Sequence, residues 1–580
     1  MSLRLVIAAL CALCANAFAE APDILGAEDE ERYRAIFALQ EAGKMSEADA
    51  LIPQIENPIL LGYVFEQRYM HPTAYRSSYS ELARWLSSYA DHPAAPRVYR
   101  LAMRRRPQGA RPQRPVSRRW RTSTGVPLTP ALQADYDRLS ASRRRQVARI
   151  EGRIRYLLAK DRPTQALNYL NDPRQFNVLT SRQTDRVRGW IAESYYVNGK
   201  LSDAQKLAET AANRSGNAAL MANWTAGLVN WRKGSTEKAL RYFSVVAEEP
   251  NQETSLRAAG AFWAARSALG VGKADEALRY LEIASAYPLT LYGQLALGQL
   301  GRDPGIAWDG LRLAAEDAAD LMERNPRLAR AAALTEIGRA EDASLEIRYA
   351  HGELKKDDDR DLLAFAASLN ATSAQVHIAE AIGIREQNNP ELWSALYPVP
   401  DDLEPTGGFT IDQAVLFGLI RQESKFMTNA ESRVGAAGLM QLMPRTASYI
   451  SGDRRLALSR TKASKKLFDP SYNMQLGQSY VNMLLTEYNN GRGDLFEMAL
   501  SYNWGPGNFS RWKRRSGITD DLLMLESVPN KEARHFVDVV MTNIWVYRDR
   551  LGQPAPARDA VAAGNKPLYQ SVSSDGGEAL

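Results

Sequence analysis

Apolar residues recur at helical spacing along most of the chain, and short polar phrases interrupt them at intervals. From about Glu28 onward each phrase starts with glycine and carries alanine five residues later. The phrases are "GKMSEA", "GKLSDA", "GSTEKA", "GKADEA" and "GRAEDA", from Gly43, Gly199, Gly234, Gly272 and Gly338. Such a glycine ends one helix, the polar residues begin the next, and the alanine lets that helix pack closely on its neighbour.

The spacing of these phrases predicts helix-turn-helix repeats. Three successive phrases start 35 and 38 residues apart, at 199, 234 and 272, and another follows after 66 residues, at 338, which leaves room for two units. These intervals match repeats of the tetratricopeptide kind, which cannot bury their apolar faces alone and therefore stack. Because strand patterns are nearly absent, we predict an all-α chain with an N-terminal α-superhelical, TPR-like solenoid.

The segment "NNPELWSALYPVPDDLEPTGG", residues 388–408, breaks the pattern with prolines and a glycine pair. It predicts the main boundary, with Trp393 and Tyr397 packing a connecting helix. A chain of 580 residues also exceeds what one core usually holds. The predicted parts are a signal peptide at 1–19, an α-superhelical domain at 20–330, a linker helical domain at 331–402, a last helical domain at 403–552 and a disordered tail at 553–580.

The first nineteen residues, "MSLRLVIAALCALCANAFA", have the layout of a cleavable secretory signal. Their apolar run is too short to span a bilayer, and leucine precedes each cysteine where a lipoprotein signal needs a small residue. We therefore expect an exported protein without an integral membrane segment after signal removal. Both cysteines, Cys11 and Cys14, lie in this segment, so the mature protein is expected to have neither disulfides nor a thiol nucleophile.

The formal charge of +6 is mild and does not by itself indicate nucleic acid. The basic excess is concentrated from Arg97 to Arg121, where ten arginines occur without an acid. Two interpretations stay open: an exposed linker or insertion between helices, which is favoured, and a surface that docks onto a polyanionic partner. The histidines are scattered without ligand spacing, and no phosphate or dinucleotide fingerprint occurs, so we expect no metal and no cofactor.

One carboxylate, Glu423, ends the apolar run "IDQAVLFGLIRQES". A helical stripe through Leu416, Leu419 and Ile420 continues to Glu423, which places this glutamate at the edge of the core-facing side. Burial would raise the pKa of its carboxyl, as a general acid near neutral pH requires. The alternative, an ordinary ion pair with an arginine such as Arg421 or Arg433, is equally compatible with this helix alone.

Two later segments carry groups that suit a sugar-binding cleft. "SRVGAAGLMQLMP", from Ser432, has two glycines that would let backbone approach a ligand, followed by Gln441 among methionines. "SYNWGPGNF" places Tyr502, Asn503 and Trp504 beside a glycine-proline-glycine turn. Sugars have apolar faces and hydroxyl rims, which aromatic rings, amides and hydroxyls can bind.

Five motifs together resemble the soluble lytic transglycosylases of family 1, which cleave peptidoglycan with a lysozyme-like domain. They are "LIRQESKF", "SRVGAAGLMQLMP", "YNMQLGQSYVNMLL", "ALSYNWGPGNF" and "ESVPNKEARHFVDVV", between Thr410 and about Tyr547. The resemblance extends more loosely to the N-terminal array through "HPTAYRSSY" and "YGQLALGQLG". It implies a C-terminal lysozyme-like, mainly α catalytic domain at 403–552 behind an α-superhelix, in a periplasmic enzyme.

The resemblance also implies roles for single residues. Glu423 would be the sole catalytic acid and base, and Tyr502 would lie close to the reacting sugar. Further cleft residues would be Ser432, Gln441, Met443 and Glu532. Two positions depart from the family pattern: Arg433 stands where proline is usual, and Trp504 stands where alanine is usual in a Tyr-Asn-Ala-Gly phrase. The second departure puts the shape of the cleft wall, and hence the substrate preference, in question.

A single acid suffices when the nucleophile belongs to the substrate, whereas most glycosidases need two acids. Between Glu423 and Asp453 the only acidic residue is Glu431. This count agrees with what the resemblance implies, which is non-hydrolytic cleavage of the MurNAc-(β1,4)-GlcNAc bond with a 1,6-anhydro product. Two rivals remain, a hydrolytic muramidase helped by Glu431 or a distant Asp, and a non-catalytic scaffold that binds glycan and proteins. Expected partners are peptidoglycan glycan strands and cell-wall synthesis or division proteins.

Overall fold

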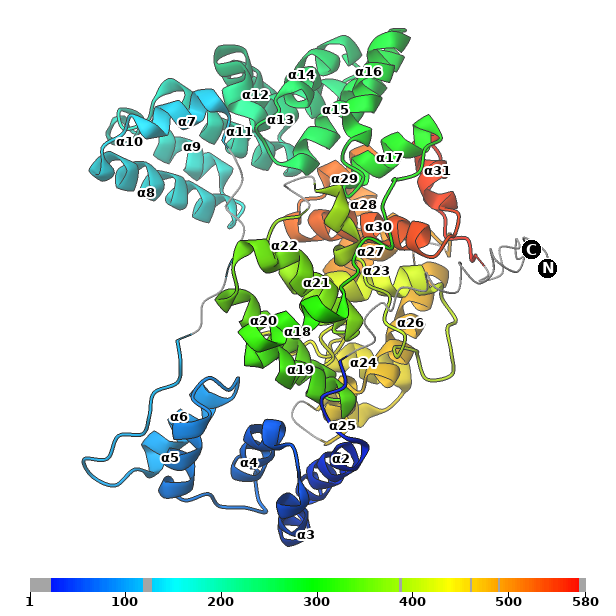
Figure 1. Cartoon of the computed structure of the whole chain (residues 1–580). Helices are drawn as coiled ribbons and strands as arrows, with labels where there is room; N and C mark the ends of the chain where they lie inside the picture. Colours follow the sequence, from blue (N-terminus) through cyan, green and yellow to red (C-terminus); the bar gives the residue numbers. More distant parts are fainter. Residues whose placement is uncertain are drawn as a thin grey trace, which may run out of the picture. The chain divides into compact units, whose positions relative to one another are not determined.

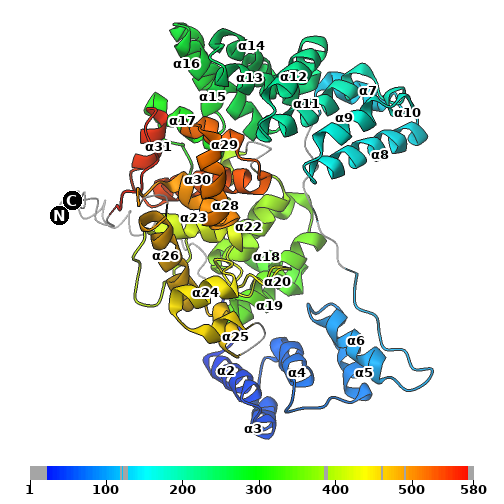
Figure 2. The same cartoon turned by 180° about the vertical axis from the view of Figure 1, so that it is seen from behind.

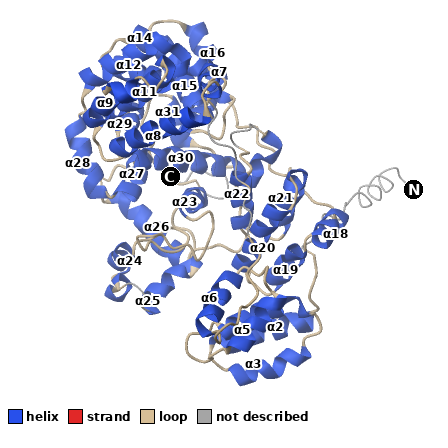
Figure 3. Cartoon of the chain, turned by 90° about the vertical axis from the view of Figure 1, so that its left-hand side faces the viewer, coloured by secondary structure: helices blue, strands red, loops and turns tan. Residues whose placement is uncertain are grey.

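The computed structural model of the chain describes residues 22–117, 121, 128–384, 389–458, 462–488 and 491–572, without the side chains of 462 and 463. The predicted signal peptide at 1–19 lies outside the described residues. The described part is helical throughout (Figure 1), and its only β pairings are three isolated bridges. Figure 3 accordingly shows helices and loops without a strand in that part. The prediction of an all-α chain is confirmed.

The described chain forms two compact units that do not follow the chain order. The first comprises Met1–Ser123, Ile306–Leu403 and Lys425–Asn429, and the second comprises Thr124–Gly305, Glu404–Ser424 and Ala430–Leu580. The predicted domain at 20–330 is therefore divided between the two, which is a correction. The boundary between Leu403 and Glu404 lies one residue after the predicted end of the linker domain at 402.

The first unit joins the N-terminal helices to those after residue 306. Its helices are α2 (Ala27–Glu41), α3 (Met45–Leu51), η1 (Ile52–Gln54), η2 (Pro58–Leu60), α4 (Leu61–Tyr69), α5 (Tyr79–Ser88), α6 (Ala95–Arg105), α18 (Ala315–Arg324), α19 (Pro326–Glu336), α20 (Ala340–Glu353), η4 (Lys356–Asp358), α21 (Asp359–Ser368), α22 (Thr372–Ala381) and η5 (Pro390–Leu396). Polar contacts between residues distant in sequence hold the two parts together. Tyr63 donates to buried Glu346 at 2.9 Å, and the same carboxylate accepts from Arg327 at 2.8 Å.

The basic stretch from Arg97 belongs to this first unit. Arg97 to Arg105 lie in α6, and residues 106–117 have no regular structure. Arg105 donates to Ser77, and Arg121 forms an ion pair with Asp359. The stretch therefore begins as a helix and continues as an exposed connection, in keeping with the first of the two interpretations.

The second unit begins with an array of paired helices. They are α7 (Pro130–Asp137), α8 (Ala141–Leu158), α9 (Pro163–Asn171), α10 (Pro173–Phe176), α11 (Ser181–Val197), α12 (Leu201–Ser215), η3 (Gly216–Ala219), α13 (Leu220–Arg232), α14 (Thr236–Glu248), α15 (Thr254–Gly270), α16 (Ala274–Ser285) and α17 (Leu291–Leu300). From α11 to α17 each helix packs on the next, as Figure 2 shows from behind. Alanines such as Ala192, Ala208 and Ala222 fill the core between them.

The glycine-alanine phrases do what their pattern predicts. The five glycines have φ between +74° and +79°, a left-handed conformation that glycine adopts at little cost after a helix. The alanines five residues later, Ala48, Ala204, Ala239, Ala277 and Ala343, are at most 1% exposed. The phrases therefore mark the turn between two helices and the point where the second helix packs closely.

The second unit ends with the helices of the last domain. They are α23 (Gln413–Glu423), α24 (Pro444–Ser451), η6 (Arg454–Ala457), α25 (Lys462–Lys465), η7 (Lys466–Phe468), α26 (Pro470–Thr486), α27 (Leu495–Trp504), α28 (Pro506–Ser516), α29 (Asp521–Ser527), α30 (Lys531–Arg550) and α31 (Pro556–Ala562). The long helix α30 packs on α23, on α27 and on α17 of the array. Arg534 of α30 forms an ion pair with Glu193 of α11 at 2.7 Å.

The prediction of a disordered tail from 553 is wrong for residues 553–572. Helix α31 packs on α17, where Gly298 leaves room for Ala562, and Gln299 donates to the carbonyl of Ala562 at 2.8 Å. Small apolar residues, which made the segment read as mobile, are what allows this close packing. Residues 573–580 lie outside the described part. Within the described residues no helix is long and apolar enough to cross a bilayer.

Candidate active site

Glu423 is the last residue of α23, a helix buried on all sides rather than along one stripe. Ala414 to Arg421 are all buried, because α23 packs against α30 and lies between other helices of the domain. Asp412 precedes the helix and forms a buried ion pair with Arg548 of α30 at 2.6 Å, which fixes the start of α23. The helix ends at Glu423 because Ser424 caps it and the two residues after Ser424, Lys425 and Phe426, have positive φ.

The carboxyl of Glu423 has no ion pair or hydrogen bond within the part of the chain that the structure describes. Neither arginine considered as its partner pairs with it: Arg421 is 1% exposed and donates to Asn543 at 3.2 Å, and Arg433 is exposed. Burial raises the pKa of Glu423 to about 8, and the nearby carboxylate of Glu532 raises it further toward that value. A carboxyl with this pKa still holds its proton at neutral pH.

Tyr502 lies beside Glu423, as the electrostatics of the two groups show. Burial raises the pKa of the Tyr502 hydroxyl well above its usual value, and the carboxylate of Glu423 adds to this. The hydroxyl donates to the carbonyl of Met440 at 2.7 Å. The ring contacts Tyr480 at a centroid distance of 5.2 Å and stacks on Phe536 at 6.0 Å. The tyrosine is thus fixed in position next to the carboxyl.

Glu532 lies in the first turn of α30, where a carboxylate suits the positive end of the helix. The residue is exposed, and Asn530 caps the helix by accepting from the backbone N–H of Ala533 at 3.2 Å. Its charge acts on Glu423. The structure therefore brings Glu423, Tyr502 and Glu532 together, although 109 residues separate the two glutamates in the chain (423 to 532).

Ser432 and Gln441 hold one tight turn. The hydroxyl of Ser432 accepts from the backbone N–H of Ala436 at 2.9 Å. The amide of Gln441 donates to the carbonyls of Ala430 and Gly438 at 3.0 and 2.9 Å. Both side chains are thereby used inside the turn, which leaves the carbonyl oxygen of the Gln441 amide without a partner among the described residues.

Of the two glycines of this turn, Gly438 approaches protein rather than an open space for ligand, whereas a Cβ at Gly435 would meet nothing within 4 Å. A Cβ at Gly438, whose φ is +76°, would lie 2.2 Å from the carbonyl oxygen of Leu467. Asn473 of α26 locks the same turn, because its amide donates to the carbonyls of Ala437 and Leu467 and accepts from the N–H of Met440. At Gly438 the expected close approach to a ligand is therefore replaced by close packing of backbone on backbone.

The remaining predicted residues line the surface near these groups. Met443 is 40% exposed at the start of α24, whereas Met440 is fully buried. Asn503 and Trp504, the last residues of α27, are half-buried, and Trp504 contacts Trp512 at 6.3 Å. Glu431, the acid considered as a second catalytic group, is exposed and forms a bridge with Ala437.

Three supporting residues were not singled out from the sequence: Tyr480, Phe536 and Asn473. All three lie in motifs that carry the resemblance, "YNMQLGQSYVNMLL" and "EARHFVDVV". Helical spacing alone marks Tyr480 and Phe536 as core, because their role depends on the position of Tyr502 on another helix. Tyr480 and Phe536 could have been found as aromatic residues on the helix faces that pack against the polar ring of Tyr502.

Comparison with known proteins points to the same segment. Residues 404–524 match the family model of the transglycosylase SLT domain. The soluble lytic murein transglycosylase of Escherichia coli (strain K12) is 32% identical over 162 residues, which is 28% of this chain and 24% of that relative. The match thus spans about a quarter of the length of this curated relative.

Similar solved structures extend over nearly the whole chain. The 70 kDa soluble lytic transglycosylase from Escherichia coli has a TM-score of 0.53 and 16% identity, covering 91% of this chain and 97% of the other. The lytic transglycosylase Slt of Pseudomonas aeruginosa, solved as an inactive glutamate-to-glutamine mutant, has a TM-score of 0.52 and 18% identity, covering 96% and 90%. At these identities the likeness concerns the fold. The chain thus carries a transglycosylase SLT domain at 404–524 within the superhelical and lysozyme-like fold of the soluble lytic transglycosylases.

Proposed function

We propose that this protein is a lytic transglycosylase that cleaves the glycan strands of peptidoglycan, with Glu423 as its single general acid and base. The observation that carries the proposal is the carboxyl of half-buried Glu423, whose pKa is raised to about 8 by loss of contact with water and which has no partner among the described residues. A general acid must hold its proton at the working pH, and few carboxyls do so at neutral pH. The matched SLT domain supports the choice of substrate.

The proposed reaction has two proton transfers. Protonated Glu423 gives its proton to the glycosidic oxygen as the bond from that oxygen to C1 of N-acetylmuramic acid breaks. The resulting carboxylate then takes the proton of the C6 hydroxyl, whose oxygen forms a bond with C1. The product is a 1,6-anhydro ring, and no water is consumed. An attacking group within the same sugar gains from proximity, by up to roughly 7 to 11 kcal/mol in well-oriented cases.

Digestion of purified sacculi tests this proposal. The parent protein should release muropeptides that end in an anhydro sugar, and Glu423→Gln should release none while keeping the parental Tm at pH 4. Continued digestion by the glutamine variant would mean that Glu423 is not the acid. If the last domain only held glycan and the superhelix only bound proteins, neither protein would release muropeptides.

A second candidate is a hydrolytic muramidase, and the proximity of Glu532 to Glu423 favours it more than the sequence did. Two carboxyl groups near one glycosidic bond are the usual equipment for hydrolysis. The mass of the products separates the two reactions, because hydrolysis adds one water per cleaved bond, and the product that ends in N-acetylmuramic acid is heavier by that water than its anhydro form. Products one water heavier throughout, together with loss of activity in Glu532→Gln, would favour hydrolysis over anhydro formation.

We further propose a periplasmic location, which rests on the signal-like first nineteen residues and on the peptidoglycan substrate. Cell fractionation with and without these residues tests it, because export should fail in their absence. Contact with cell-wall synthesis or division proteins stays a prediction.

A further inference from the structure

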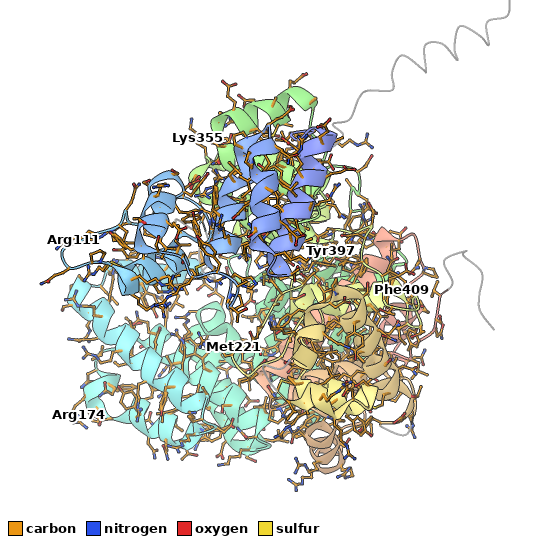
Figure 4. All side chains as sticks on the ribbon, turned by 90° about the horizontal axis from the view of Figure 1, so that it is seen from below. Arg111, Arg174, Met221, Lys355, Tyr397 and Phe409 are labelled. Atoms are coloured by element: carbon orange, nitrogen blue, oxygen red, sulfur yellow. The ribbon has the colours of Figure 1, made fainter. Side chains whose placement is uncertain are left out.

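A cavity of about 940 Å³ lies within the second unit, next to the residues of the candidate active site. One part of its lining comes from the helix array, through α8, α11, α13 and α15, and the other from the end of α27 and the start of α30. Met221 of α13, labelled in Figure 4, is one of the lining residues. Cavities of 300–1,000 Å³ are typical of small-molecule sites in general.

Two residues connect this cavity to Glu423. Glu532 lines the cavity, and its carboxylate also raises the pKa of Glu423. Trp504 lines the cavity as well, at the C-terminal end of α27, the helix that also carries Tyr502. A chain molecule bound at Glu423 could therefore continue into the cavity past these two side chains.

The basic groups of the lining are largely paired within the protein. Arg534 forms an ion pair with Glu193 at 2.7 Å. Arg155 and Arg186 share the carboxylate of Glu151, at 3.1 and 3.2 Å. Paired guanidinium groups offer little surplus charge to an anionic ligand, which makes an acidic peptide a poor candidate for the main occupant.

Aromatic surface, in contrast, is available. Trp504 is half-buried, contacts Trp512, and its indole N–H has no acceptor among the described residues. Trp190 of α11 is also half-buried and lies 4.7 and 4.9 Å from the guanidinium groups of Arg155 and Arg186, which hold its ring in place. The guanidinium groups thus occupy the ring of Trp190, whereas the ring of Trp504, with its free N–H, suits a ligand with apolar faces and a hydroxyl rim.

We propose that this cavity binds saccharide units of the glycan strand beyond the units at Glu423, and that the ring of Trp504 stacks on these units and makes the protein prefer longer strands. The inference rests on the proposed function and deepens it. Trp504 supplies an aromatic wall to the cavity lining. It extends the contact with the strand without taking part in bond cleavage.

Binding of N-acetylglucosamine oligomers in the Glu423→Gln protein tests the proposal by calorimetry. The tetramer, which is short enough for the cleft at Glu423, and the octamer, which would reach the cavity, are compared in three further variants. Trp504→Ala removes the wall. Ser194→Trp fills the cavity from α11, away from Glu423. Ser202→Trp makes the same change at an exposed position of α12 outside the cavity and is the matched control.

Trp504→Ala and Ser194→Trp should each weaken octamer binding by roughly three- to tenfold, the range expected for one aromatic contact, and Ser194→Trp should leave tetramer binding unchanged. Ser202→Trp should bind both oligomers like the parent. Equal octamer affinity in all variants would overturn the proposal, and so would a parent that binds the octamer no better than the tetramer. If the cavity variants lost only the binding of a free stem peptide and kept that of both oligomers, the proposal would be overturned in favour of a peptide site.

Failure of the proposed function would be seen elsewhere. It would appear as continued release of muropeptides by the Glu423→Gln protein, or as products one water heavier, and neither result depends on Trp504. Circular dichroism and the Tm of each variant confirm that loss of octamer binding is not loss of fold.

Discussion

The carboxylate of Glu532, at the start of α30, raises the pKa of Glu423, at the end of α23. Burial of Glu423 is the larger cause of the shift and Glu532 the smaller one. A negative charge nearby disfavours ionisation of a second carboxyl, which keeps Glu423 protonated over a wider range of pH.

The pH profile of kcat/KM should therefore have its alkaline limb near pH 8. A general acid works only while it holds its proton, and the pKa of Glu423 is raised to about 8. Activity on purified glycan should stay constant toward neutral pH and fall as the pH rises through 8. An alkaline limb near pH 4 to 5, as expected for an ordinary exposed carboxyl, would contradict this assignment.

Replacing the second glutamate should move that limb. In Glu532→Gln the like charge is gone, so the pKa of Glu423 falls and the alkaline limb moves to lower pH. The movement should cover only part of the distance to an ordinary glutamate, because burial remains. Glu431→Gln is the matched control, since Glu431 is exposed and does not contribute to the pKa of Glu423. An unmoved limb in Glu532→Gln would show that the two carboxyls do not interact in solution.

Stability should depend on pH through the same carboxyl. Since the pKa of Glu423 is raised in the folded state, the folded protein holds a proton that the unfolded chain loses between about pH 4.5 and 8. This contribution to stability is fully present below pH 4.5 and is lost as the pH rises through 8. Glu423→Gln has no such proton to lose.

The variant should therefore match the parent in Tm at pH 4 and exceed it at pH 9. The difference at pH 9 is at most about 5 kcal/mol, because the pKa of Glu423 rises from 4.5 to about 8 and each pKa unit corresponds to about 1.4 kcal/mol. Thermal unfolding at the two pH values measures it. A variant that is less stable than the parent at pH 9 would mean that the carboxylate of Glu423 has a favourable partner in the folded state.

Local rules explain which parts of this fold and site could be predicted from the sequence. A glycine with positive φ after a helix and an alanine at a close helix contact depend only on neighbouring residues, so the repeated phrases identified the array. The position of Glu423 at the end of an apolar helix was predicted for the same reason.

Contacts between distant residues explain the rest. The pairing of Tyr63 with Glu346, which joins the N-terminal helices to the helices after residue 306 within the first unit, has no local signal in the sequence. Neither does the proximity of Glu532 to Glu423, although the resemblance placed both in one cleft. The composition of residues 553–572 suggested a mobile tail, because alanine and glycine give no sign of the surface on which they pack.

Gly438 should be the least replaceable glycine of the turn beside Glu423. In Gly438→Ala the new Cβ would lie 2.2 Å from the carbonyl oxygen of Leu467 and the backbone would keep a φ of +76°. Gly435→Ala shares the positive φ, at +90°, but its Cβ would meet nothing within 4 Å. Positive φ costs each variant about 1–3 kcal/mol, and only Gly438→Ala adds a collision. The Tm should fall further in Gly438→Ala, and equal Tm values would refute the packing role.

Residues 553–572 should be needed for a stable catalytic domain. Helix α31 covers part of α17, and the segment after it reaches the start of α23. There Ser571 donates to Asp412 at 3.1 Å, beside the ion pair of Asp412 with Arg548. The backbone of Leu568 also forms a bridge with Asp494, which caps α27, the helix that carries Tyr502.

A chain ending at residue 552 should therefore unfold at a Tm several degrees lower than the full chain. In this chain the apolar surface of α17 becomes exposed, and α23 and α27 lose contacts at their starts. A chain ending at residue 572 is the control and should keep the parental Tm. Activity on sacculi, measured at a temperature where both chains are folded, shows whether residues 553–572 only stabilise the fold or also contribute to catalysis. Equal Tm values for the two truncated chains would mean that the packing of α31 on α17 contributes nothing to stability.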